Sequence, residues 1–216
     1  MIRIITVERE YGSQGAEYAL NLARRLNWKL IDHCLIDDIA RKAGVSSEQA
    51  ERYDERLDPW YYRVGKAFWH GSIERMPSIP DAVVFDSESS VKLVDECLHE
   101  ATEAGNCVVV GRGAASVLSG VHGAFHVFVY ASMGRKIRWF EKNFPEHAGI
   151  AEQELLETDR RRAAYIRRFH DRDWTDRRLY HLMMNSCMGF DAMVSATIDA
   201  AGLQQVVHDE PAAAGH

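Results

Sequence analysis

Short runs of consecutive apolar residues are the main feature of the hydrophobic pattern along this chain. They lie at residues 3–7, 29–31, 107–110, 125–130 and 181–184. These runs are rich in Val and Ile, are bounded by Gly, and do not alternate between apolar and polar positions. Such runs are typical of strands that are buried on both faces. The pattern therefore predicts a parallel sheet covered by helices.

Between these runs, apolar residues recur at helical spacing. The sets are Ala16, Ala19, Leu20, Ala23 and Leu26, then Val91, Val94, Leu98 and Ala101, then Ile137 and Phe140, and finally the stretch 191–201. Strands that alternate with helices of this length indicate βαβ units with right-handed crossovers. The sequence therefore predicts an α/β fold, a parallel β-sheet flanked by helices on both faces, in a single domain over residues 1–210.

Two segments depart from this regular pattern. Residues 56–81 contain three prolines and a group of aromatic residues, and we interpret them as an irregular insert or an interface. Residues 211–216 are predicted to form a disordered tail.

Charge and cysteine content exclude several classes of protein. The formal net charge of −6 gives no general attraction to nucleic acid or to an anionic membrane. No apolar stretch approaches the roughly 20 residues that a transmembrane helix needs, and the first residues do not form a signal peptide. The four cysteines form no CxxC pair, and the histidines show no zinc-ligand spacing. We therefore expect no metal site in the protein itself, reduced thiols and a cytoplasmic location.

The first apolar run is followed by a glycine-containing turn and the start of a helix, Glu10-Tyr11-Gly12-Ser13-Gln14-Gly15-Ala16. A helix that begins directly after a strand presents unpaired backbone N–H groups, and its dipole favours an anion at this end. The turn is therefore a candidate phosphate site. The alternative is a pair of glycines that only makes a tight turn.

A second buried strand, residues 107–110, ends in Gly111-Arg112-Gly113. An arginine at the carboxyl end of such a strand lies in the crevice where open α/β sheets bind ligands. Arg112 is therefore a candidate phosphate contact. A structural salt bridge is the alternative.

Arginines concentrate between residues 159 and 178, a stretch that contains eight arginines and four aspartates. The whole chain has twenty arginines and six lysines. The planar guanidinium group binds phosphate in bidentate fashion. Asp159 and Arg162 are three residues apart, so they share one face of a predicted helix. The stretch suggests a small anionic ligand, and a solvated helix face is the alternative.

The opening of the chain resembles that of cytidylate kinases. It has an apolar strand, a turn in the place of a P-loop, a helix that ends in Leu26-Asn27-Trp28 and a strand that leads to Asp32. The run Arg9-Glu10-Tyr11-Gly12-Ser13 and the Gly111-Arg112-Gly113 turn resemble the cytidylate kinase-like branch in particular. The resemblance covers about residues 2–200. It implies a P-loop nucleoside monophosphate kinase-like fold with an Arg-rich helical lid at about residues 155–178.

The resemblance also implies an activity, an ATP-dependent phosphotransferase that acts on a pyrimidine nucleoside monophosphate. ATP with Mg²⁺ is then expected at Gly12, Ser13, Gln14, Gly15, Ala16 and Glu17. The monophosphate is expected at Asp32, Arg41, Arg112, Asp159 and Arg162, and catalytic roles fall to Asp159, Arg162 and Arg168. The implied partner is a small-molecule nucleotide. The oligomeric state stays open, with a homodimer as one option.

Two positions depart from the kinase pattern. Gly15 stands where a P-loop has its lysine, and Gly113 stands where cytidylate kinases have an aspartate. Both favour an alternative function, a nucleotide-binding regulatory or sensor protein that keeps the kinase fold without phosphoryl transfer. A third interpretation is a structural partner protein that uses the aromatic segment 59–69.

Overall fold

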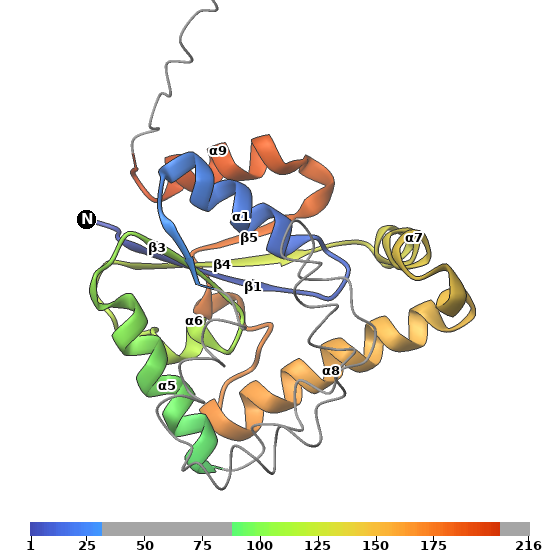
Figure 1. Cartoon of the computed structure of the whole chain (residues 1–216), viewed down its shortest axis with the longest axis horizontal. Helices are drawn as coiled ribbons and strands as arrows, with labels where there is room; N and C mark the ends of the chain where they lie inside the picture. Colours follow the sequence, from blue (N-terminus) through green and yellow to red (C-terminus); the bar gives the residue numbers. More distant parts are fainter. Residues whose placement is uncertain (32–87, 204–216) are drawn as a thin grey trace, which may run out of the picture.

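β1 (Ile4–Arg9) lies inside a five-stranded parallel sheet in the computed structural model of the chain (Figure 1). The structure describes residues 1–31 and 88–203. Asp32, Arg41, the segment 56–81 and the tail 211–216 lie outside these residues. The strand order among the described residues is β2-β3-β1-β4-β5. The other strands are β2 (Lys29–Ile31), β3 (Cys107–Val110), β4 (Ala124–Tyr130) and β5 (Leu182–Asn185).

All the described strand pairs are parallel, so the carboxyl ends of the strands lie at one edge of the sheet. Ile4 of β1 pairs with Cys107 on one side and with Ala124 on the other. The predicted parallel sheet is therefore confirmed. β1 begins one residue later than the predicted strand and ends two residues later, because its pairing with β4 continues to Arg9.

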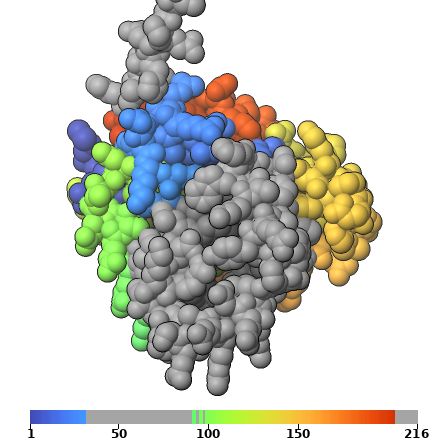
Figure 2. Space-filling view, viewed as in Figure 1, coloured from blue at the N-terminus to red at the C-terminus, as the bar shows by residue number. Residues whose placement is uncertain are grey.

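Helices cover both faces of the sheet. They are α1 (Gly15–Leu26), α5 (Glu88–Glu103), α6 (Ala114–Val117), α7 (Met133–Asn143), α8 (Ala151–His170) and α9 (Phe190–Ala200). Short 3-10 turns lie at Pro145–Ile150, Arg177–Leu179 and Ser186–Met188. α1 and α9 lie over one face and α5, α6 and α8 over the other, while α7 lies beyond the carboxyl edge (Figure 1). The space-filling view shows α1 and α9 beside each other at the surface (Figure 2).

The two faces of β1 belong to different parts of the core. Ile5 and Val7 pack in one cluster with Leu22 of α1, whereas Ile4 packs in another cluster with Leu98 of α5. This division follows from the strand geometry, since successive side chains point to opposite faces. Both faces of the strand are buried, and the polar residues Thr6 and Glu8 lie on the same face as Ile4.

The arginine-rich segment that was expected to form a lid lies in α8 and in the loop that follows it. α8 packs onto the rest of the structure through Ala151, Leu155 and Ile166, which are all buried. Of its arginines, Arg162 is half-buried, whereas Arg160, Arg161, Arg167 and Arg168 are exposed. Among the described residues, no helix is both long enough and apolar enough to span a membrane.

Candidate functional site

The turn between β1 and α1 lies at the carboxyl edge of the sheet. Its backbone enters the left-handed region at Gly12 (φ +74°) and at Gln14 (φ +63°). The Ser13 backbone N–H and hydroxyl both donate to the Glu10 carbonyl, over 3.2 and 2.7 Å. A Cβ atom at Gly12 would lie 3.0 Å from the Leu155 side chain of α8. The sequence therefore folds here into a tight turn that packs closely against α8.

α1 begins at Gly15, directly after this turn. Its N-cap residue, Gln14, makes no side-chain cap, and its amide group donates instead to Glu17 over 2.9 Å. The first N–H groups of a helix have no partner within the helix, and the dipole makes this end positive. The turn thus has the backbone arrangement that anion-binding sites use.

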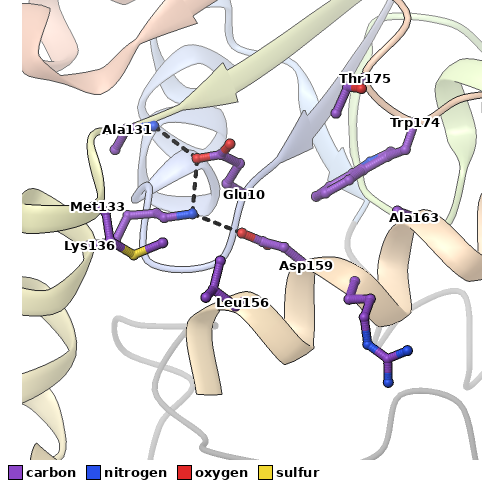
Figure 3. A pocket seen from close by; sticks show the side chains of 10 residues that line it. Glu10, Ala131, Met133, Lys136, Leu156, Asp159, Ala163, Trp174 and Thr175 are labelled. Carbon is purple, nitrogen blue, oxygen red and sulfur yellow. Dashed lines mark hydrogen bonds and ion pairs between the residues drawn. The ribbon is translucent and has the colours of Figure 1, made fainter. Parts of the chain in front are cut away.

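A lysine from α7 lies beside the turn. Lys136 is only 4% exposed, and its Nζ atom lies 2.9 Å from Asp159 Oδ2 and 3.1 Å from Glu10 Oε2 (Figure 3). Burial lowers the pKa of Lys136, but the nearby Asp159 and Glu10 outweigh burial, so that the pKa is raised overall. Lys136 is therefore charged at neutral pH and bridges the two carboxylates.

Asp159 connects α8 to the turn. Its Oδ1 atom accepts a hydrogen bond from the Tyr11 backbone N–H over 2.7 Å, while Oδ2 accepts from Lys136. Burial raises the pKa of the Asp159 carboxyl, and the Tyr11 N–H and Lys136 oppose that rise. Because both close partners are donors and the pKa of Lys136 is raised, we assign an ion pair at neutral pH.

Arg162 lies one helical turn after Asp159 in α8. Its Nη1 atom donates to the Arg9 carbonyl over 2.9 Å and lies 3.9 Å from Asp159 Oδ1. Its guanidinium carbon lies 5.6 Å from the centre of the Tyr11 ring. The prediction that Asp159 and Arg162 share one helix face is confirmed. Both side chains contact the backbone of residues 9–11.

A cavity of about 420 Å³ opens beside this cluster. It is lined by Glu10, Ala131, Met133, Lys136, Leu156, Asp159, Arg160, Ala163, Trp174 and Thr175. In Figure 3, Lys136 and Asp159 lie on one side of the cavity and the Trp174 ring on another. The volume lies in the range of small-molecule sites, which combine apolar walls with a few polar groups.

Comparison with known proteins places the chain in a family. The model of the cytidylate kinase-like family matches residues 4–187. The chain belongs to the cytidylate kinase-like family. No curated protein matches the chain significantly.

Solved structures share the fold of this cytidylate kinase-like protein. An uncharacterized protein from Eubacterium ventriosum is 18% identical, with a TM-score of 0.67 over 94% of this chain and 99% of that chain. Shikimate kinase from Bacteroides thetaiotaomicron is 16% identical, with a TM-score of 0.51 over 94% of this chain and 100% of that one. At these identities the likeness shows the fold alone, that of P-loop kinases.

Gly15, the position at which the resemblance leads us to expect the P-loop lysine, has no space for a side chain in this cytidylate kinase-like protein. A Cβ atom at Gly15 would lie 2.5 Å from the Arg9 Cβ atom and 3.2 Å from Val129. The lysine that P-loops carry at this point therefore does not fit unless β1 moves. Lys136 instead brings an ammonium group to the turn from α7.

The second glycine turn lies next to the first. Gly111, Arg112 and Gly113 all adopt positive φ angles, and the Arg9 guanidinium lies against Gly111. A Cβ atom at Gly113 would lie 2.9 Å from His170 Nε2. A side chain at Gly113, where the resemblance leads us to expect an aspartate, would therefore collide with α8. Burial lowers the pKa of His170, so its imidazole is neutral at pH 7.

The predicted site residues within the described part of the chain divide into three groups. Residues 12–17 form the turn and the start of α1, and Asp159 and Arg162 lie directly against the turn. Arg112 lies on the neighbouring turn. Arg168 lies near the end of α8, is exposed, and places its guanidinium 4.9 Å from the Phe169 ring centre. It does not line the cavity.

The sequence interpretation missed Lys136, Glu10 and Trp174. For Lys136 a signal was present, since it precedes Trp139 and Phe140 by three and four residues and so shares their helix face. Both aromatic residues are buried, as is Lys136. A lysine on the apolar face of a helix indicates a buried cation with a partner.

Glu8 is a second buried carboxylate, behind the cavity. It is 4% exposed, and its Oε2 atom accepts from Trp174 Nε1 over 3.3 Å. Its Oε1 atom has no hydrogen-bond partner among the described residues. Burial raises the pKa of Glu8, and the charge of Arg9 opposes the rise.

Proposed function

We propose that this protein is a phosphotransferase that moves a phosphoryl group between ATP and a nucleoside monophosphate, a pyrimidine one by resemblance. The observation that carries the proposal is the turn at residues 10–14. At this turn, the N-terminal end of α1 lies at the carboxyl edge of a parallel sheet, and Lys136 and Arg162 lie beside the turn. A cytoplasmic location, where ATP is available, belongs to the same proposal.

The proposed roles follow from position and charge. The N–H groups at the start of α1, from Gly15 to Glu17, would bind phosphate oxygens. Arg112 and Arg162 would hold the phosphate of the acceptor from two sides, with Asp159 orienting Arg162 and Arg168 closing from the end of α8. Phosphoryl transfer depends on positioning and charge neutralisation, and these residues supply both. ATP with Mg²⁺ would supply the transferable group and a neutralising cation.

The described residues fit the phosphate chain of ATP better than they fit a bound metal. Mg²⁺ in kinases is held by one or two carboxylates together with phosphate oxygens and water. Glu10 and Asp159 border the cavity, but both are ion-paired with Lys136. A metal at these carboxylates would compete with the ammonium group. We therefore assign Mg²⁺ mainly to phosphate oxygens and water.

The second candidate function is a nucleotide-binding sensor without phosphoryl transfer. Two observations favour it. Gly15 has no space for a lysine, and the space beside Gly113 is filled by His170. The protein could then bind a nucleotide at its turn, but it would lack the lysine and the aspartate on which kinases of this type depend.

A panel of nucleotides distinguishes the two functions. The purified protein is titrated with ATP and with each common nucleoside monophosphate in the presence of Mg²⁺, and ADP release is then measured at high protein concentration. The phosphotransferase proposal expects binding of ATP and ADP release with at least one acceptor. Binding without ADP release supports the sensor function, and no binding of any nucleotide contradicts both.

Gln14→Glu tests whether the turn is the phosphate site. The substitution adds a carboxylate at the N-cap of α1, where it would repel the phosphate chain, so we expect ATP affinity to fall by about tenfold, the effect of one charged hydrogen bond. Gln153→Glu adds the same charge on the exposed side of α8 and is the matched control. Equal affinities of the two variants for ATP would place the phosphate elsewhere.

A further inference from the structure

Three donors of positive character converge on the carboxylate of Asp159. The Tyr11 backbone N–H lies 2.7 Å from Oδ1, Lys136 Nζ lies 2.9 Å from Oδ2, and Arg162 Nη1 lies 3.9 Å from Oδ1. A backbone N–H, an ammonium group and a guanidinium group are the donors that proteins use for phosphate oxyanions. Here the position between them is held by a side chain of the protein itself.

We propose that Tyr11 N–H, Lys136 and Arg162 form a phosphate-binding site in which the Asp159 carboxylate is an internal competitor. A phosphate group of a ligand binds by exchanging with this carboxylate. The inference rests on the proposed function, since it assigns the cation that serves the phosphate chain at this turn. It also reverses the role expected for Asp159, which becomes a group that opposes phosphate binding.

Lys136 and Arg162 remain in place when Asp159 leaves them. Lys136 has a second partner, Glu10, whose carboxylate is itself held by the Ala131 N–H over 3.2 Å. Arg162 has a second partner in the Arg9 carbonyl. Rotation of one side chain, Asp159, would therefore open the site while the donors keep their positions.

The cavity provides the route to this site. Lys136 and Asp159 both line it, as do Leu156 and Ala163 of the apolar wall (Figure 3). A ligand in the cavity would reach Lys136 directly, because Lys136 is part of the lining. The Lys136 ammonium group would then supply the positive charge that a P-loop lysine supplies to the phosphates. A lysine side chain at Gly15 has no space to do so.

Asp159→Asn tests the exchange, with inorganic pyrophosphate as the probe and calorimetry as the measurement. The amide keeps the shape of the side chain and removes its charge, so pyrophosphate affinity is expected to rise by about tenfold. Glu157→Gln is the matched control, because it removes a carboxylate from the same helix that pairs with Arg160 and Arg161 rather than with the turn. The pyrophosphate affinity of Glu157→Gln should equal that of the wild type.

Substitutions of the two ion-pair partners, Asp159 and Lys136, should have opposite effects on pyrophosphate affinity. Lys136→Met in the Asp159→Asn background should remove the gain in pyrophosphate affinity. Unchanged or weaker binding by Asp159→Asn overturns the proposal and returns Asp159 to the role of a ligand contact. Absence of pyrophosphate binding in all variants overturns it as well.

A measurement on the wild-type protein is independent of any loss of folding in the variants. The amide resonance of Tyr11 reports directly on its hydrogen-bond acceptor, so pyrophosphate should shift it at the concentrations at which calorimetry detects binding. Pyrophosphate binding without this shift overturns the proposal. If pyrophosphate binds as expected but no nucleotide does, the phosphate site stands and the proposed phosphotransferase function fails.

Discussion

Glu8 combines deep burial with incomplete hydrogen bonding. Burial raises its pKa above the ordinary value of 4.5, so the folded protein holds the proton more tightly than the unfolded chain does. The unfolded chain loses this proton first as the pH rises. The contribution of Glu8 to stability is therefore largest at low pH and is lost as the pH rises through its raised pKa.

Glu8→Gln should remove this pH dependence. Glutamine is neutral at every pH and its carbonyl can still accept from Trp174, so the variant should be more stable than the wild type at pH 8, by about 1–3 kcal/mol if the cost of the buried charge is typical. Thermal unfolding between pH 4 and pH 8 measures the difference.

Glu157→Gln is the control. Arg160 and Arg161 lower the pKa of Glu157 to about 2, so its stabilising effect has the opposite dependence on pH. A wild type and a Glu8→Gln variant with parallel pH profiles would contradict the argument.

The contact between β1 and the start of α1 depends on the absence of a side chain at Gly15. We expect Gly15→Ala to destabilise the protein by about 1–3 kcal/mol, as overpacking does, because the added Cβ atom would lie 2.5 Å from Arg9 Cβ. Chemical denaturation measures the effect. Gly134→Ala in α7 is the matched control, since its Cβ atom would meet only Arg138 Nη1 at 3.6 Å. That substitution should stabilise by up to about 1 kcal/mol. Similar stabilities of the two variants would show that β1 can shift to accommodate the added Cβ atom at position 15.

The elements were predictable from the sequence to a greater extent than the site. β3 has the predicted bounds, because a run buried on both faces is apolar throughout. β2 also has the predicted bounds, although Lys29 is exposed and only Ile31 is buried. Lys136 could not be assigned to the turn in the same way, since its contact with Asp159 depends on how α7 and α8 pack. The position of His170 beside Gly113 likewise depends on the path of α8. Patterns of single elements do not contain this information.

The first and last described helices are joined by one buried hydrogen bond. Tyr18 of α1 lies 2.6 Å from the Thr197 hydroxyl of α9, and Thr197 itself donates to the Met193 carbonyl. A hydroxyl has a single proton, so Tyr18 must be the donor between them. The bond connects parts of the chain that lie 179 positions apart.

Tyr18→Phe should lower the free energy of unfolding by about 1 kcal/mol, the net value of one hydrogen bond. Urea denaturation measures this change. Tyr130→Phe removes a hydroxyl from the exposed end of β4 and is the control, for which we expect no measurable change. Equal effects of the two substitutions would mean that the α1–α9 contact depends on packing alone.

The place of β1 in the sheet has a consequence for the synthesis of the protein. Its two neighbours are β3 and β4, so Ile4 has no strand to pair with until Cys107 and Ala124 have left the ribosome. At about 5–20 residues per second, the nascent strand waits on the order of seconds with its apolar side chains and both edges open. Such strands are prone to pair with other chains. We therefore expect the nascent chain to depend on chaperone protection for the segment that later carries the proposed phosphate-binding turn.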